Sequence, residues 1–170
     1  MILRASPVEA SAPPPGQEIW EAIDPDHLTT LSEEITTLFA ELQAETHRLL
    51  LLIEEFDRME GWRREGFASC VDWLAYSTRI DKMTAREKVR VARQLVHLPE
   101  TSTAMARGEL SFSQVRALTR VADADSELEL LGYAREMSAA SLEKLVPLWE
   151  AKQLAIVQGI GYPDANLSHF

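Results

Sequence analysis

Four basic side chains share one edge of a helix that the sequence predicts from Thr84 to Leu98. Their spacings of four, three and four residues place them in one narrow stripe at about 100° per residue: Arg86, Arg90, Arg93 and His97. Apolar residues occupy the other side of the same helix: Ala85, Val89, Ala92, Leu95 and Val96. A guanidinium group binds phosphate oxygens through its charge and its paired N–H donors. This edge could therefore contact a polyanion.

Capping motifs make this basic helix the second of a predicted helix-turn-helix unit. Ser69 to Asp72 predicts the start of a short helix, Ile80 to Met83 a turn, and Thr84 to Glu87 the start of the basic helix. In such units the N-terminal end of the second helix enters the DNA major groove. Thr84, Arg86 and Arg90 would approach bases or phosphates. Four further cations would supply charge near the DNA backbone: Arg79, Lys82, Lys88 and Arg93. The alternative is the solvated face of an ordinary helical domain.

The chain is acidic overall, with a formal net charge of −10, but its charges are unevenly distributed. Residues 1–60 hold 13 acids and 3 bases, and residues 121–170 hold 8 acids and 3 bases. Residues 61–120 hold 6 acids and 11 bases, a local excess of +5. A local patch rather than the total charge decides where an anion binds. The predicted helix-turn-helix lies within residues 61–120, which we call the basic island.

A long helix precedes the basic island, because apolar residues step by three and four from Leu28 to Met59 before Gly61 ends the pattern. We call these residues the seam: Leu28, Leu31, Ile35, Leu38, Leu42, Leu49, Leu52, Phe56 and Met59. The pattern resembles a heptad repeat that is interrupted at Glu45. It fits a helix packed on its own domain, and it also fits a homodimer whose copies meet along the seam.

The composition favours helix nearly everywhere, with 46% hydrophobic residues, 7 Gly and abundant Leu, Ala, Glu and Arg. We expect an all-α protein in which a long N-terminal helix is followed by a multi-helix domain containing the helix-turn-helix-like unit. Proline and aperiodic composition predict a disordered arm over residues 1–23 and an unstructured tail over residues 158–170. The helical domain would span residues 24–157.

Other helix boundaries follow from local signals. The long helix could begin at Asp24-Pro25, or one turn later at a capping box that Thr30 opens. Ser111 opens another capping box with Gln114, after a brief helix that ends at Gly108. Asp125 or Ser126 would cap a helix that runs through Tyr133. Ser138 would cap the last helix, which runs through Trp149. Pro147 should kink or split the last of them.

The sequence contains no arrangement typical of an enzyme site, a metal or a cofactor. The four histidines are far apart and have no Cys or carboxylate at metal-ligand spacing: His27, His47, His97 and His169. His47 falls off the seam and is predicted at the surface. Asp123 to Glu127 resembles the start of a calcium loop but lacks the later glycine and glutamate, so helix capping explains it better. Cys70 is predicted to be a buried structural thiol.

The single cysteine and the hydropathy pattern suggest a compartment. Cys70 alone cannot form an internal disulfide, which fits a reducing environment. The longest purely aliphatic run, Leu49 to Ile53, is far shorter than the roughly 20 residues that a membrane span requires. The N-terminal residues lack the pattern of a signal peptide. We therefore expect a cytoplasmic protein.

Several motifs together resemble the domain of unknown function 222, the 13E12-repeat family of bacteria. The resemblance runs from about Leu31 to Trp149. It rests on these segments: Gly61-Trp62, Ser69 to Leu74, Thr84-Ala85-Arg86, Val89 to Arg93, Leu98-Pro99-Glu100, Gly108 to Ser111 and Gln114 to Leu118. In many members this helical domain precedes an HNH nuclease domain, which implies a role beside DNA. The segment from Leu98 to Leu118 is also similar to the region after the helix-turn-helix of ParB-type partition proteins.

The sequence departs from that family pattern after Trp149. No HNH-type His and Asn constellation and no zinc-knuckle cysteines follow that residue, so the resemblance does not imply nuclease catalysis here. We expect a DNA-associated helical module without catalytic activity and without a cofactor. The alternatives are a protein-interaction or dimerisation module that uses the seam, and the truncated N-terminal half of an HNH endonuclease.

Overall fold

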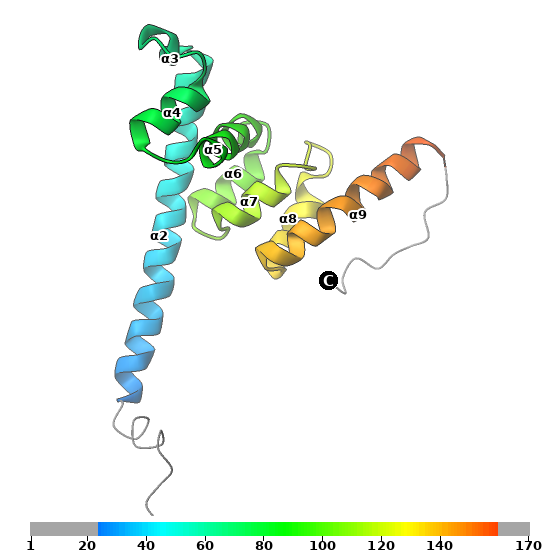
Figure 1. The fold of residues 1–170 in the computed structure, drawn as a ribbon. Helices are drawn as coiled ribbons and strands as arrows, with labels where there is room; N and C mark the ends of the chain where they lie inside the picture. The colour runs from blue at the N-terminus through cyan, green and yellow to red at the C-terminus, as the bar shows by residue number, and fades with distance from the viewer. Residues whose placement is uncertain (1–23, 160–170) are drawn as a thin grey trace, which may run out of the picture. The chain divides into compact units, whose positions relative to one another are not determined.

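The computed structural model describes residues 24–159. Within that range the chain forms eight helices and no strand, which confirms the all-α class (Figure 1). In order, the helices are α2 (Pro25–Arg58), α3 (Gly61–Arg64), α4 (Cys70–Thr78), α5 (Lys82–Leu95), α6 (Pro99–Ala106), α7 (Phe112–Leu118), α8 (Glu127–Glu136) and α9 (Ala139–Val157). The predicted arm over residues 1–23, and the predicted tail from residue 160 onward, lie outside the described residues.

The chain divides into two compact units, and the boundary between Thr37 and Leu38 falls within α2. In the first unit, the described residues Asp24 to Thr37 form the first turns of α2, and every one of them is exposed. The second unit contains the rest of α2 and the seven helices that follow. No helix among residues 24–159 combines the length and the apolar content that crossing a lipid bilayer requires.

The first turn of α2 settles which of two predicted starts the chain uses. The helix begins at Pro25, and the Asp24 carboxylate accepts a hydrogen bond from the Asp26 amide at 3.0 Å. Proline suits the first helical position because that amide has no partner within the helix. The Thr30 hydroxyl donates instead to the Asp26 carbonyl, so Thr30 lies inside the helix and the alternative start is wrong.

In the core of the second unit, apolar side chains from one face of most of its helices pack together. Its largest fully buried side chains are Trp149, Leu50, Leu95, Leu98, Met105, Leu110, Leu118, Leu130 and Leu145. α4 packs on α5, α6 on α8, and α7 on α9. Burying a side chain of this size contributes about 1.5–3 kcal/mol, so this core fixes the position of α5.

Capping at α6 and α7 was only partly visible in the sequence. Ser111 and Gln114 form the predicted capping box of α7. α6 ends, as predicted, before Gly108, whose positive φ of 73° suits glycine. At the other end of α6 no nearby side chain caps the helix; instead the buried Glu127 carboxylate of α8 accepts a hydrogen bond from the Thr101 amide at 2.7 Å. A residue 26 positions away therefore supplies this cap.

The last two helices correct one prediction and confirm another. Ser138 caps α9 as predicted, accepting a hydrogen bond from the Ser141 amide. α9 then runs through Pro147 as one helix, so of the predicted kink or split the split does not occur, and the kink stays a prediction. α8 begins after Ser126, whose amide and hydroxyl donate to the Asp123 carboxylate. Helix-start hydrogen bonding thus accounts for the acidic segment that resembled a calcium loop.

Candidate interaction surfaces

The predicted two-helix unit corresponds to α4, a three-residue turn and α5. Ser69 caps α4 as predicted, since its hydroxyl accepts a hydrogen bond from the Asp72 amide at 3.1 Å. α4 ends at Thr78, and Arg79 turns the chain in the left-handed conformation, with a φ of 59°. α5 then packs against α4 (Figure 1). The order of the elements agrees with the sequence, and the docking of a helix-turn-helix on DNA stays a prediction.

The basic helix begins two residues earlier than predicted, at Lys82. Asp81 is its N-cap: one carboxylate oxygen accepts from the Thr84 amide at 2.9 Å and the other from the Thr84 hydroxyl. These hydrogen bonds hold the pKa of the Asp81 carboxyl below its ordinary value. The capping box that Thr84 was predicted to open is therefore wrong, because an ionised aspartate competes well for the N-cap and favours the positive end of the helix dipole. The Thr84 hydroxyl is engaged inside the helix.

Two of the predicted phosphate-binding cations form ion pairs within the chain. Lys82 Nζ lies 2.6 Å from Asp72 Oδ1 of α4. Arg93 Nε donates to Asp57 Oδ2 of α2, also at 2.6 Å. The pKa of Asp72 is lowered mainly because its carboxylate accepts the hydrogen bond from Lys82. The pKa of Arg93 is raised mainly because its guanidinium donates the hydrogen bond to Asp57. Both cations remain largely exposed, so a phosphate would compete with a carboxylate for each.

Arg90, which the sequence predicts to contact nucleic acid, also joins two elements of the fold. Its guanidinium donates from Nη2 to the Arg116 carbonyl at 2.9 Å and from Nη1 to the Thr119 carbonyl at 3.2 Å. These carbonyls lie at the C-terminal end of α7, where backbone acceptors lack helical partners. The same guanidinium pairs with Glu87 at 3.2 Å. Arg90 thus joins α7 to α5.

Lys88 is also partly committed to packing. Its Nζ lies 4.5 Å from the centroid of the Phe112 ring, in a cation–π contact between α5 and the start of α7. Burial lowers the pKa of Lys88. A side chain held over an aromatic ring reaches outward less readily than a free lysine, and phosphate binding by Lys88 stays a prediction.

Among the described residues, Arg79 and Arg86 are the predicted cations that form neither an ion pair with an acid nor a cation–π contact. Both side chains are exposed, and Arg86 Nη1 lies 3.4 Å from the Met83 sulfur. The charge of Arg86 adds a small lowering of the pKa of Asp72, behind the hydrogen bonds from Lys82 and Ser69. Arg86 therefore belongs to the same surface as the Lys82–Asp72 pair. The cationic surface that α4 and α5 offer is small.

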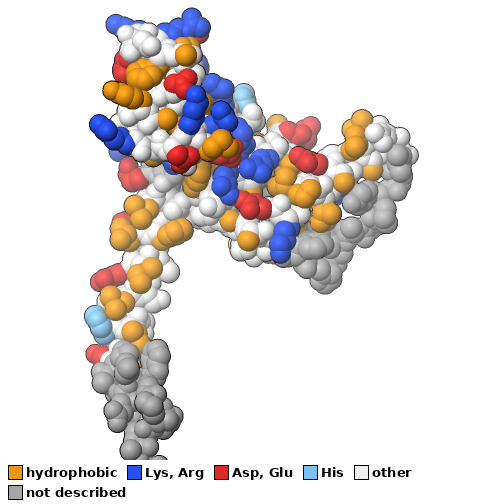
Figure 2. Space-filling model, viewed as in Figure 1, with side chains coloured by type: hydrophobic (Ala, Val, Ile, Leu, Met, Phe, Trp, Pro, Cys, Tyr) orange, Lys and Arg blue, Asp and Glu red, His pale blue; other side chains and the backbone are white. Residues whose placement is uncertain are grey.

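Folding also draws acids from both flanking segments onto the basic island. Asp57 and Glu60 precede the island in sequence and pair with Arg93 and Arg63, while Glu143 follows it and pairs with Arg116. Acids inside the island pair with cations too: Arg107 with Glu109, and Arg120 with Glu87. Figure 2 accordingly shows blue and red side chains interspersed in this part of the molecule. The +5 excess of the sequence therefore overstates the positive surface.

The seam of α2 is largely uncovered within the chain. All of its members except Phe56 are large hydrophobic side chains with exposed fractions between 39% and 67%: Leu28, Leu31, Ile35, Leu38, Leu42, Leu49, Leu52 and Met59. Orange side chains accordingly recur along α2 in Figure 2. Packing of the seam on its own domain, one of the two predicted alternatives, holds for the half-buried Phe56 and not for these eight.

Within the second unit, a different face of α2 packs against the other helices. Its buried residues are Gln43, Leu50 and Ile53. Gln43 Oε1 accepts a hydrogen bond from the Phe112 amide at 2.8 Å, although the two residues are 69 positions apart. Gly108 lies so close to α2 that an added Cβ would be 2.6 Å from the Ala40 carbonyl oxygen. α2 therefore has a docked face and an open face.

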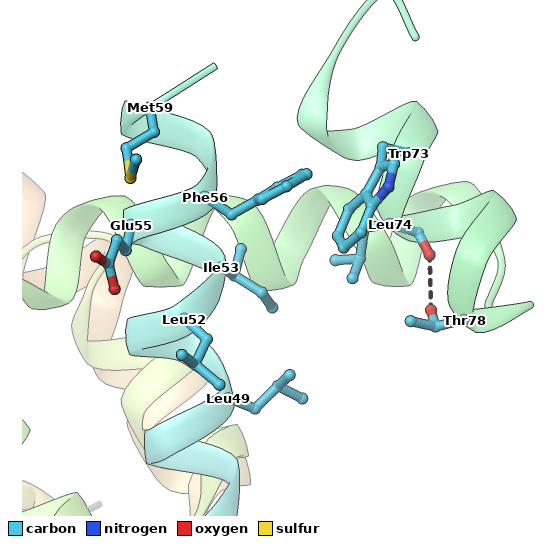
Figure 3. Close-up of a pocket in the computed structure, with 9 residues that line it drawn as sticks. All are labelled: Leu49, Leu52, Ile53, Glu55, Phe56, Met59, Trp73, Leu74 and Thr78. Atoms are coloured by element: carbon cyan, nitrogen blue, oxygen red, sulfur yellow. Dashed lines mark hydrogen bonds between the residues drawn. The ribbon is translucent and has the colours of Figure 1, made fainter. Parts of the chain in front are cut away.

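An apolar groove lies between the C-terminal half of α2 and α4, with a volume of about 430 Å³. Figure 3 shows Trp73 and Leu74 of α4 facing Ile53 and Phe56 of α2. The rings of Phe56 and Trp73 lie 4.1 Å apart, centroid to centroid. The rest of the groove wall comprises Leu49, Leu52, Glu55, Met59 and Thr78. Since four seam residues line it, the groove continues the open face.

Cys70 and His47 occupy structural positions. Cys70 is buried, as predicted, and burial is the main reason that the pKa of its thiol is raised to about 11. His47 was predicted at the surface, but its Nε2 lies 2.8 Å from Ser102 Oγ of α6 and burial lowers its pKa. The prediction therefore holds only in part: His47 is half-buried, because helix periodicity turns it away from the seam and toward α6. Among residues 24–159 no three His, Cys, Asp or Glu residues gather as a metal ion would require.

Three residues that shape these surfaces have little signal in the local sequence pattern. Gln43 is a buried amide in a helix of mostly exposed residues. The pattern around Trp73 predicts a short helix but no groove, and the segment that ends at Glu127 resembles the start of a calcium loop. Each of these side chains works through a partner far away in sequence, so local patterns could not identify them. A Gln or Glu beside the apolar stripe of a helix is the one signal that local reading could have used.

The family comparison agrees with the resemblance found in the sequence. A family model described as "Domain of unknown function (DUF222)" matches residues 29–159. No curated protein and no solved structure matches the chain.

Proposed function

The chain belongs to the DUF222 family, and we propose that it is a non-catalytic protein-interaction module that self-associates through the seam of α2. The family description assigns no activity. The proposal includes a cytoplasmic setting, which a single buried thiol at Cys70 supports.

The open face of α2 carries this proposal. Eight large apolar side chains along one helix are exposed in the single chain, and three of them line a groove that is itself apolar. Monomeric proteins rarely leave a contiguous apolar surface of this extent in water. Fully burying a Leu or Ile side chain is worth about 1.5–3 kcal/mol relative to exposure, so a partner that covers the seam gains substantial free energy.

The spacing of the seam favours a second copy of the same chain as that partner. Its members fall at a and d positions of five successive heptads, with Leu28 and Leu31 in the first and Phe56 and Met59 in the last. A straight α-helix drifts by about 20° per heptad from such a repeat, so a strict seven-residue period is the pattern of two helices that supercoil around each other. A second copy of the chain has the same seven-residue period because its sequence is identical.

Substitution on the seam tests the proposal. The double variant Leu38→Glu, Leu42→Glu places two carboxylates in the middle of the seam, where burial would be strongly unfavourable. We expect the wild-type chain to elute as a dimer in size-exclusion chromatography with light scattering, and the variant as a monomer. Circular dichroism of the variant should remain helical because both residues are exposed in the single chain.

A matched control separates the seam from charge alone. Thr37 is exposed on another side of the same helix, and Thr37→Glu adds a carboxylate there. This variant should remain dimeric. A wild-type chain that is monomeric at every accessible concentration would contradict the proposal, and so would equal masses for the seam variant and the Thr37 variant.

A second candidate function, nucleic-acid association through α4 and α5, is favoured by one observation. Arg79 and Arg86 are exposed, and neither pairs with an acid in the part of the chain that the structure describes. Two phosphate contacts would give a weak, salt-sensitive interaction. A dimer would present this surface twice, as helix-turn-helix dimers do on two half-sites.

Charge reversal tests the second candidate. Arg79→Glu with Arg86→Glu should abolish the retardation of a DNA duplex at 50 mM salt without changing the dimer mass. Arg64 is a suitable control, since it also lacks an acid partner among residues 24–159 but lies on α3. Equal retardation by the charge-reversed chain and the wild type, or none by either, would exclude this candidate.

A further inference from the structure

The groove between α2 and α4 lies wholly within the second unit, and its walls are held in place by contacts inside that unit. The Phe56 ring of α2 stacks on Trp73 of α4, with centroids 4.1 Å apart. Gly61 of α3 lies against the same ring, because a Cβ added at Gly61 would collide with Phe56. A surface that is already formed costs less to cover than one that must first become ordered.

The polar side-chain atoms that α4 contributes to the groove wall already have hydrogen-bond partners. Trp73 Nε1 donates to Glu65 Oε2 at 2.7 Å. The Thr78 hydroxyl donates to the Leu74 carbonyl, also at 2.7 Å. A polar group that is already hydrogen-bonded can be covered at little cost, whereas an unpaired one cannot. This wall is therefore suited to burial under an apolar partner.

Glu55 is the charged residue of the groove wall, and it can remain in water when the groove is covered. Its side chain is exposed, and Figure 3 shows it on the side of α2 that faces away from Trp73 and Leu74. The rest of the lining consists of Leu, Ile, Phe, Met and Trp side chains and Thr78. An occupant of the groove must therefore present apolar side chains.

We propose that α4 forms part of the self-association surface, and that a second copy of the chain covers the groove together with the adjoining part of the seam. This inference rests on the proposed self-association and adds a second helix to it. Leu49, Leu52, Phe56 and Met59 belong to both the seam and the groove. A helix that covers these residues therefore also meets α4, whichever way the second copy runs.

A second copy supplies the apolar side chains that the groove requires. Within the second unit, these members of the seam are exposed: Leu38, Leu42, Leu49, Leu52 and Met59. Stable complexes bury roughly 800 Å² on each partner. The wall of α4 adds to the area that one helix face can supply.

Trp73 is the anchor of the added surface. It is half-buried, and both the Phe56 ring and the hydrogen bond to Glu65 fix its orientation. Tryptophan side chains in well-packed pockets contribute a large share of the binding energy in many interfaces. Because the Trp73 ring is already oriented, little side-chain entropy is lost when it is covered.

Two neighbouring exposed positions of α4 test this inference. Thr78 lines the groove, whereas Ser77 does not. Thr78→Glu would place a carboxylate in the apolar hollow, so we expect the dissociation constant of the dimer to rise by roughly tenfold or more. Ser77→Glu adds the same charge at the same end of α4 and should change the constant by less than about twofold. Sedimentation equilibrium would measure both.

A third variant separates charge from shape. Thr78→Val keeps the branched side chain and removes only the hydroxyl, so the dimer should be at least as stable as that of the unmodified chain. Circular dichroism should show equal helicity for the three variants, because both positions are exposed in the single chain.

The outcomes distinguish this inference from the self-association on which it rests. A wild-type chain that is monomeric at every concentration would overturn both. A dimer that Leu38→Glu with Leu42→Glu disrupts, and that Thr78→Glu leaves intact, would overturn the role of α4 alone. Equal weakening by Thr78→Glu and Ser77→Glu would also overturn it, since that result would show an effect of charge rather than of burial in the groove.

Discussion

Two helices of this chain, α5 and α2, have amphipathic patterns that are equally clear in the sequence, but they differ in the folded chain. The cationic edge of α5 is largely satisfied inside the chain, since Arg90 binds carbonyls of α7 and Arg93 binds Asp57. The apolar edge of α2 is largely unsatisfied, since its seam is exposed apart from Phe56. Partners within the chain explain the first pattern, and the second pattern supports the proposal that a partner outside the chain covers the seam.

The contrast arises from the range over which each interaction can find a partner. A guanidinium group can donate hydrogen bonds to any nearby carboxylate or carbonyl, and a folded domain contains many of these acceptors. An apolar helix face needs a matching apolar surface over several turns. The docked face of α2 meets such a surface around Leu50 and Ile53, and the open face does not.

The largest expected effect concerns the docked face of α2. Gly108→Ala should lower the free energy of unfolding by about 3 kcal/mol, because the added Cβ meets the Ala40 carbonyl oxygen at 2.6 Å and the left-handed backbone disfavours a side chain. Urea denaturation followed by circular dichroism would measure the loss.

Gly66 provides the control for that change. It also has a positive φ, of 81°, but a Cβ there would have no neighbour within 4 Å. Gly66→Ala should therefore cost only about 1 kcal/mol. Equal losses at Gly66 and Gly108 would mean that α2 is not held closely at Ala40, and the distinction between a docked and an open face would fail.

Arginine truncation sharpens the contrast within α5. Arg90→Ala should lower the free energy of unfolding by about 2 kcal/mol, since charge-assisted hydrogen bonds to carbonyls of α7 are lost. Arg86→Ala should change it by less than about 0.5 kcal/mol, because Arg86 is exposed. Urea denaturation of both variants measures the difference. A reversed order of the two losses would contradict the structural role of Arg90.

Salt should act differently on the two surfaces. Between 50 and 200 mM NaCl, DNA affinity through two phosphate contacts should fall by roughly tenfold, whereas association through the apolar seam should change by less than about twofold. Fluorescence anisotropy of a labelled duplex and sedimentation velocity of the chain would follow the two processes in the same buffers. A dimer that dissociates steeply with salt would mean that ion pairs rather than the seam hold it together.

The smallest expected effect is a pH dependence at His47. Burial lowers the pKa of His47 in the folded chain, so the unfolded chain takes up a proton first as the pH falls below about 6.5. The stabilisation is therefore complete above that pH and declines below it. Urea denaturation between pH 7 and pH 5 should show a shallower decline for His47→Gln than for the unmodified chain. Identical pH profiles for the variant and the unmodified chain would contradict the packing of His47 on α6.

Local signals in the sequence were sufficient for most of the fold. Ser69, Ser111 and Ser138 cap the predicted helices, Gly108 follows the end of α6, and the seam lies on one long helix. Local signals do not decide between two neighbouring residues that could both cap the same helix. Asp81 displaced Thr84 as the cap of α5, although both residues suit that position.

The surfaces could be predicted less well because they depend on distant partners. Arg90 and Thr119 are 29 positions apart, and the acids that pair with Arg93 and Arg116 come from segments outside the basic island. No window of sequence contains those pairs. A heptad pattern likewise fits an internal and an external partner equally well, and the exposure of the seam in the folded chain supports the proposal of an external one.

Sedimentation equilibrium of the unmodified chain tests the central claim most directly. If a second copy covers the open face of α2, the mass at micromolar concentration should approach twice the 19.1 kDa of one chain and fall toward 19.1 kDa on dilution. A mass of 19.1 kDa at every concentration would contradict the claim that the seam is an interface between copies.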